Sequence, residues 1–124
     1  NHDAHIHDKT FSTWHMSENR ALVFQAIYEF FKSLPLSVFR GKGFLNLDEV
    51  PDRQVVVQMV GKRVTISKGE KWGEKERSSD IVLIANSDDH DQEKIAEQFK
   101  SCLATGAARA PNRLADAVIE ILRA

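Results

Sequence analysis

Residues 36–47, LSVFRGKGFLNL, alternate two kinds of side chain along their length. This period of two predicts a long β-strand, because successive side chains of a strand point to opposite faces of the sheet. Two glycines would then lie opposite two cations; the glycines favour close packing or a β-bulge, and the cations suit a solvated or docking face. The predicted faces are Phe39, Gly41, Gly43, Leu45 and Leu47 on one side and Val38, Arg40, Lys42, Phe44 and Asn46 on the other.

Other stretches of the chain also favour strands. Gly61 and Lys62 separate two segments rich in β-branched residues, which predicts a β-hairpin. The segment Ile81–Ala85 is unbroken apolar sequence, as expected for a strand buried on both faces. Trp72 is the one aromatic residue in a charged stretch and predicts an anchored loop. The further predicted strands are residues 10–16, 54–60, 63–68 and 81–85, and the loop is 69–79.

Three segments have the spacing of amphipathic helices. Ser17 is placed to cap the first, which Pro35 ends. Asp89 and Gln92 resemble a capping box at the start of the second, and Asn112 can cap the third. The predicted helices are residues 17–34, 89–103 and 112–123.

This order of elements predicts an α+β fold: a mostly antiparallel sheet with helices packed on one face and an extra C-terminal helix. Residues 1–9 are too polar to form a core and are expected to be a His-rich linker, which leaves residues 10–124 as one domain. The predicted core contains Phe24, Ile27, Phe31, Phe39, Leu45, Val57, Val82, Ile84, Ile95 and Phe99.

Composition narrows the class of protein. The chain has 124 residues, with 17 Lys and Arg against 18 Asp and Glu, and this length suits one soluble domain. Its single cysteine, Cys102, excludes an intrachain disulfide and is expected to be a small core residue. With no apolar run long enough for a membrane span, we expect a cytoplasmic protein with no membrane partner. The net charge of -1 argues against nucleic acid as the partner.

The motifs of common enzymes are absent from the sequence. It has neither a phosphate-binding P-loop nor a G-x-G-x-x-G turn that opens a helix after a strand. Ser12, His15 and Cys102 bear reactive groups, but the pattern does not bring a nucleophile, a base and an acid together. We therefore expect that this chain is not itself an enzyme, and that His15 is an ordinary strand residue.

The string Arg40–Leu45, RGKGFL, also resembles the third-strand motif of RNA-recognition domains. The order of elements differs, because here the strand directly follows the first helix. A small nucleic-acid-binding module that uses Arg40 and Lys42 remains the alternative function.

The first residues of the chain combine metal-ligand types. His2, His5 and His7 stand beside Asp3 and Asp8, and imidazole with carboxylate suits zinc, cobalt or nickel. A flexible segment would hold a metal only weakly, since it lacks a fixed geometry. The competing interpretation is a metal-free linker or a cloning remnant.

Taken together, the sequence resembles the C-terminal domain of the CobW family, P-loop GTPases linked to metal handling and cobalamin synthesis. The resemblance rests on the string FRGKGFL after a helix ending near Leu34, and it covers about residues 10–103. It continues in Gln58 with Gly61, Trp72, the strand Ile81–Ala85, and Cys102 with Leu103. The chain departs from the family at Ala85, where members usually have glycine, and the third helix lies beyond the match.

The resemblance implies a binding or regulatory domain that couples a GTPase domain to a metal cargo or a client. The implied partners are the N-terminal P-loop GTPase domain of the same protein and a client metalloprotein. His-rich stretches are common before this domain in the family, which supports weak zinc or cobalt binding at His2, His5 and His7. Arg40 and Lys42 are the expected partner-binding residues.

Overall fold

Five strands pair in one antiparallel sheet in the order β1-β5-β2-β3-β4, so the strand with the two glycines lies at its centre. The computed structural model describes residues 11–86, 92–105 and 111–124. The strands are β1 (Phe11–Glu18), β2 (Val38–Leu47), β3 (Val50–Val60), β4 (Arg63–Lys71) and β5 (Ser79–Asn86). The helices are α2 (Phe24–Lys32), α3 (Gln92–Lys100) and α4 (Arg113–Arg123).

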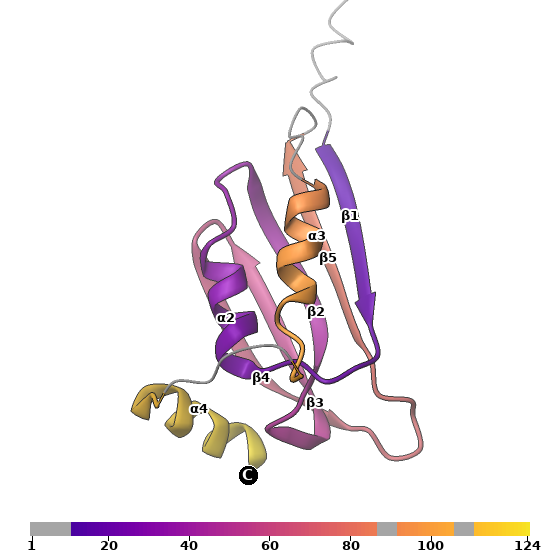
Figure 1. Ribbon diagram of the computed structural model, residues 1–124, viewed down its shortest axis with the longest axis vertical. Helices are drawn as coiled ribbons and strands as arrows, with labels where there is room; N and C mark the ends of the chain where they lie inside the picture. The colour runs from indigo at the N-terminus through magenta and orange to yellow at the C-terminus, as the bar shows by residue number, and fades with distance from the viewer. Residues whose placement is uncertain (1–10, 87–91, 106–110) are drawn as a thin grey trace, which may run out of the picture.

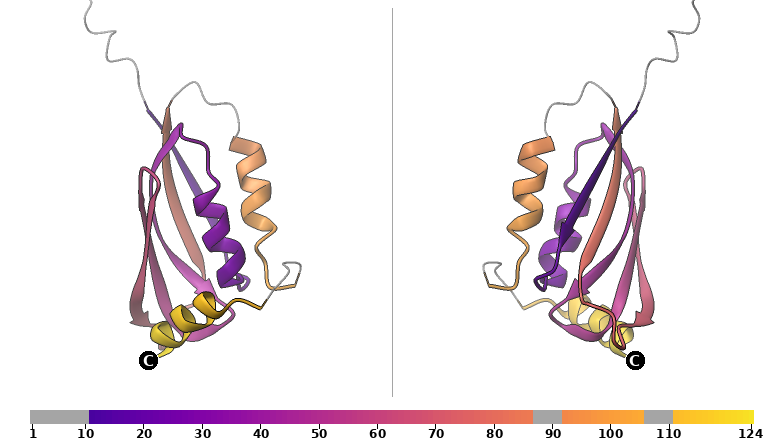
Figure 2. Two further views of the ribbon diagram at one scale, coloured as in Figure 1. Left: turned by 90° about the vertical axis from the view of Figure 1, so that its left-hand side faces the viewer. Right: turned by 90° about the vertical axis from the view of Figure 1, so that its right-hand side faces the viewer.

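Helices α2 and α3 lie side by side on one face of the sheet, and α4 crosses its lower end (Figure 1). The side views show that, among the described elements, no helix covers the opposite face (Figure 2). The predicted α+β fold, with an antiparallel sheet and helices on one face, is confirmed. Among the described helices, none combines the length and the apolar sequence that a bilayer-spanning segment requires.

The core lies between this pair of helices and the sheet. Phe30 of α2 and Phe99 of α3 bring their ring centroids to 5.8 Å, which joins the two helices. Each large apolar side chain that is fully buried contributes about 2 kcal/mol, so this layer supplies much of the stability. The predicted core residues that prove to be buried are Phe24, Ile27, Phe31, Leu45, Val57, Ile95 and Phe99.

The prediction was wrong for three core residues. Val82 is exposed, and Ile84 and Phe39 are only partly buried. Burial alternates along the run Ile81–Ala85, because only its odd-numbered side chains face the helices. Its other side chains lie on the face that no described helix covers.

Two register shifts change the faces of β2. From Arg40 to Leu45 the predicted alternation is confirmed, with the glycines inward and the cations outward. A shift between Val38 and Arg40 turns Val38 into the core. A second shift between Leu45 and Leu47 buries Asn46, whose backbone N–H donates to Ser79 Oγ at 2.8 Å.

The first helix begins at Phe24 rather than at Ser17. β1 continues through Glu18, and Ser17 Oγ donates to Asp80 Oδ1 on β5 at 2.6 Å instead of capping a helix. Arg20 then donates from its side chain and its backbone N–H to Glu18, and these bonds lower the pKa of the Glu18 carboxyl.

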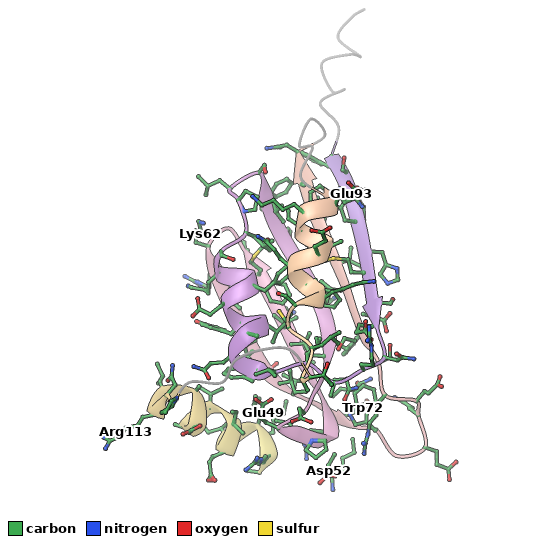
Figure 3. All side chains as sticks on the ribbon, viewed as in Figure 1. Glu49, Asp52, Lys62, Trp72, Glu93 and Arg113 are labelled. Carbon is green, nitrogen blue, oxygen red and sulfur yellow. The ribbon has the colours of Figure 1, made fainter. Side chains whose placement is uncertain are left out.

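The cap of α2 comes from a distant residue. The Phe24 N–H donates to the Glu49 carboxylate at 3.0 Å, and the negative charge suits the positive end of the helix. The backbone oxygen of Glu49 accepts from Arg123 Nε on α4 at 2.8 Å. Figure 3 shows Glu49 between these two helices. The turn between β2 and β3 therefore joins α2 to α4.

The remaining local predictions are mostly confirmed. Gly61 has φ +60° in the hairpin turn, and Asn112 accepts from the Ala115 N–H at 2.9 Å as the cap of α4. Trp72 is buried as an anchor, but β4 runs on to Lys71, so the loop is shorter than predicted. The proposed capping residue Asp89 lies outside the described residues.

Gly43 should tolerate no side chain. A Cβ atom there would meet the backbone oxygen of Asp80 and lie 2.9 Å from Ile81 Cα, both of which are held in the sheet. We expect Gly43→Ala to lower the free energy of unfolding by about 3 kcal/mol, measured by urea denaturation. At Gly41 the new atom would meet the flexible tip of Leu83, so Gly41→Ala should cost clearly less. Equal losses would contradict this explanation.

Cys102 should be chemically inert in the folded protein. Burial raises the pKa of its thiol to about 11, so only about 0.1% is thiolate at pH 8. We expect slow alkylation by iodoacetamide at pH 8, and rapid alkylation once urea unfolds the chain. Fast reaction without urea would show that the thiol is accessible.

Candidate docking surface

The face of the sheet that points away from α2 and α3 is called here the outer face. It consists of the side chains that alternate with the core residues along each strand. Strand pairing places Arg40 between Ile84 and Val60, and Lys42 between Val82 and Gln58. The outer face is therefore a continuous surface built from all five strands.

The two cations predicted to bind a partner lie at the centre of this surface. Arg40 and Lys42 are both exposed and point to the same side of β2. Within the described part of the chain, neither forms an ion pair or a side-chain hydrogen bond. Their charge is thus available to an acidic partner.

Apolar side chains surround these cations. Phe44 is 43% exposed beside Lys42, and Phe11 is 63% exposed at the start of β1. Phe11 and Phe39 pack edge to face with ring centroids 5.2 Å apart. Large apolar surface left in water with polar residues around it is typical of a protein interface.

Sequence reasoning missed the apolar part of the outer face. It assigned Val82 and Ile84 to the core because the segment around them is continuously apolar. The information needed to correct this assignment is the strand pairing, which places Lys42 beside Val82 and Arg40 beside Ile84. Burying two cations under an apolar helix would be costly, so the residues beside them on that face are expected to remain at least partly exposed.

Asp80 lies on the same face, and its carboxylate is already engaged. Asp80 Oδ1 accepts from Ser17 Oγ, and His15 Nε2 lies 3.6 Å from the same oxygen. A hydrolytic relay needs the imidazole between the hydroxyl and the carboxylate, whereas here the carboxylate lies between them. This cluster therefore lacks the geometry of a catalytic triad, and His15 is a strand residue as predicted.

The predicted metal ligands His2, His5 and His7 lie outside the described residues. Among the residues that are described, no group of three or more His, Cys, Asp or Glu could hold a metal ion.

Comparison with known proteins identifies the family. The family described as the cobalamin synthesis protein cobW C-terminal domain matches residues 11–103. No curated protein matches the chain.

Two solved structures share the fold. The Zn(II)-bound YjiA GTPase from E. coli has a TM-score of 0.66 at 19% identity, with 82% of this chain and 32% of that chain covered. A Zn(II)-bound triple mutant of YjiA gives 0.66 at 20% identity, with 75% and 30% covered. This chain thus spans about a third of each YjiA chain.

The family match takes in β1 through the residues that follow α3, including Arg40, Lys42 and the rest of the outer face, and leaves out only α4 among the described elements. The chain therefore belongs to the CobW family, whose C-terminal domain it contains.

Proposed function

We propose that this domain is the binding and regulatory module of a CobW-like GTPase that handles zinc or cobalt, in cobalamin synthesis or in another metal pathway. It couples the GTPase domain to a metal cargo or to a client metalloprotein in the cytoplasm. The observation that carries the proposal is the open outer face, with Arg40 and Lys42 unpaired within the described residues at its centre. Membership of the CobW family supports the coupling to a GTPase.

The position of β1 supports the GTPase domain as the occupant of the outer face. β1 is an edge strand, and its first residue, Phe11, lies on that face. A domain joined to the chain before Phe11 would reach the outer face by a short path. Tethering raises the effective concentration of such a domain, so a modest interface suffices to hold it.

The metal part of the proposal rests on the residues before β1. His2, His5 and His7 would bind zinc or cobalt weakly and release it easily, which suits the transfer of cargo. Zinc is bound in both YjiA structures, but this domain corresponds to only 30% and 32% of those chains, so the YjiA zinc supports a metal role of the whole protein and not a site in this domain.

One observation favours a second candidate function. Exposed Phe44 lies on the same face as Lys42, two residues away, and single-stranded nucleic acid binds such combinations of aromatic ring and cation. The nearly neutral chain weakens this alternative, because binding to phosphates needs several cations.

Reversal of both charges on β2 should separate domain docking from stability. We expect Arg40→Glu with Lys42→Glu to weaken binding to the GTPase domain of the same protein by at least about tenfold, or about 1.4 kcal/mol. The melting temperature should hardly change, because both side chains are exposed. Isothermal titration calorimetry at two salt concentrations measures the effect.

A control with the same change in charge is Arg77→Glu with Lys94→Glu, since both residues are exposed away from β2. This variant should bind normally. If the two variants bound the GTPase domain with equal affinity, Arg40 and Lys42 would not be part of the docking surface. Micromolar binding of single-stranded RNA that weakens steeply with salt would favour the nucleic-acid function.

Zinc binding should depend on the three histidines before β1. We expect saturable binding in calorimetry near pH 7 that disappears when His2, His5 and His7 are all replaced by Ala. It should also disappear near pH 5, because protonated imidazoles cannot bind metal. His15→Ala is the control and should bind as the unchanged chain does. Equal heats from the triple variant would assign residues 1–9 to a linker role only.

A further inference from the structure

Helix α4 has two groups of apolar side chains, and within the described residues one group is buried while the other is exposed. Ala115, Ile119 and Leu122 are buried against the rest of the domain. Leu114 and Ile121 are 76% and 64% exposed on the other side. An exposed pair of large aliphatic side chains on one short helix calls for an explanation, because water is a poor solvent for both.

The two exposed residues belong to one stripe. They are seven positions apart, which is nearly two turns at about 3.6 residues per turn. Ala117 lies between them on the exposed side, and its small side chain permits a second helix to approach closely. Val118 borders the stripe and is half-buried.

The stripe continues into an apolar groove. Leu114 and Val118 line a cleft of ≈410 Å³ together with Tyr28 of α2 and Val64 and Ile66 of β4, and its polar lining residues are Gln25, Glu29 and Asn112. These β4 side chains face the helix side of the sheet but remain partly exposed. The open apolar surface therefore extends from α4 over its two neighbours.

Opposite charges flank the stripe on its other side. Arg113 and Glu120 are also seven residues apart and lie along one line on α4. In the described part of the structure neither forms an ion pair. Figure 3 shows Arg113 at the start of α4, directed away from the sheet.

We propose that α4 pairs with α4 of a second copy of this chain, in an antiparallel arrangement about a two-fold axis near Ala117. Leu114 of each copy then meets Ile121 of the other. Arg113 of each copy meets Glu120 of the other, so two equivalent ion pairs form. The groove beside β4 receives the edge of the second helix.

A second copy fits this surface better than another occupant because the charges are self-complementary. A two-fold interface brings the same patch from both partners together, so each cation must face an anion of that patch. The order of Arg113, Leu114, Ile121 and Glu120 satisfies this condition when one helix is reversed. α4 lies outside the matched residues 11–103, and the stripe is separate from the outer face, so this inference does not depend on the proposed function.

Sedimentation equilibrium of the full chain, from about 10 μM to about 1 mM, tests the pairing, because an interface this small gives a weak dimer. We expect a reversible monomer–dimer equilibrium. Leu114→Glu and Ile121→Glu should each raise the dissociation constant by at least tenfold. Leu36→Glu, at an equally exposed aliphatic residue away from α4, is the control and should leave it unchanged. Circular dichroism verifies that each variant is folded.

A charge exchange makes the test specific for the antiparallel register. Arg113→Glu alone and Glu120→Arg alone should each weaken the dimer severalfold, because like charges then face each other. Arg113→Glu combined with Glu120→Arg should restore it, since both ion pairs re-form with exchanged sign. A chain that stays monomeric at about 1 mM would overturn the proposal. A dimer whose dissociation constant is unchanged by these substitutions would also overturn it.

Discussion

The packing of β5 against β2 at Gly43 is the contact on which the arrangement of the sheet depends. A side chain at Gly43 would overlap the backbone of Asp80 and Ile81, so the two strands reach their register only with glycine at this position. That register sets Lys42 beside Val82 and Arg40 beside Ile84 on the other face. The close approach on the core side therefore also determines which residues meet on the outer face.

The helices are fixed to this sheet by backbone and carboxylate contacts as well as by apolar packing. Leu22 donates to the Asn46 oxygen and accepts from the Asp48 N–H, and the Val23 N–H donates to the Cys102 oxygen. Glu49 then caps α2 and accepts from Arg123 of α4. The turn after β2 thus links all three described helices, directly or through the segment before α2.

The two surfaces of interest differ in chemistry. The outer face is broad and combines exposed cations with aromatic and aliphatic side chains, which suits a partner with acidic groups. The α4 stripe is narrow, aliphatic and bordered by both charges, which suits a copy of itself. They lie on different sides of the core, so one domain can bind a partner through the first and pair through the second.

Local patterns in the sequence predicted most of the helices and strands, their order along the chain, and the opposite faces of the glycines and cations of β2. These predictions follow from local periodicity and from residues such as Pro35 and Gly61, whereas the family was indicated by a resemblance in sequence motifs. The packing of the helices on one face of the sheet leaves Val82 exposed and Ile84 only partly buried, and this could not be predicted because an apolar run has the same sequence whether one or both faces are covered. The tertiary structure also decided that α2 starts at Phe24, since the cap is Glu49, 25 residues further along the chain. Contacts between distant segments leave no local pattern in the sequence. The docking surface could therefore be identified only from the pairing of the strands in the structure.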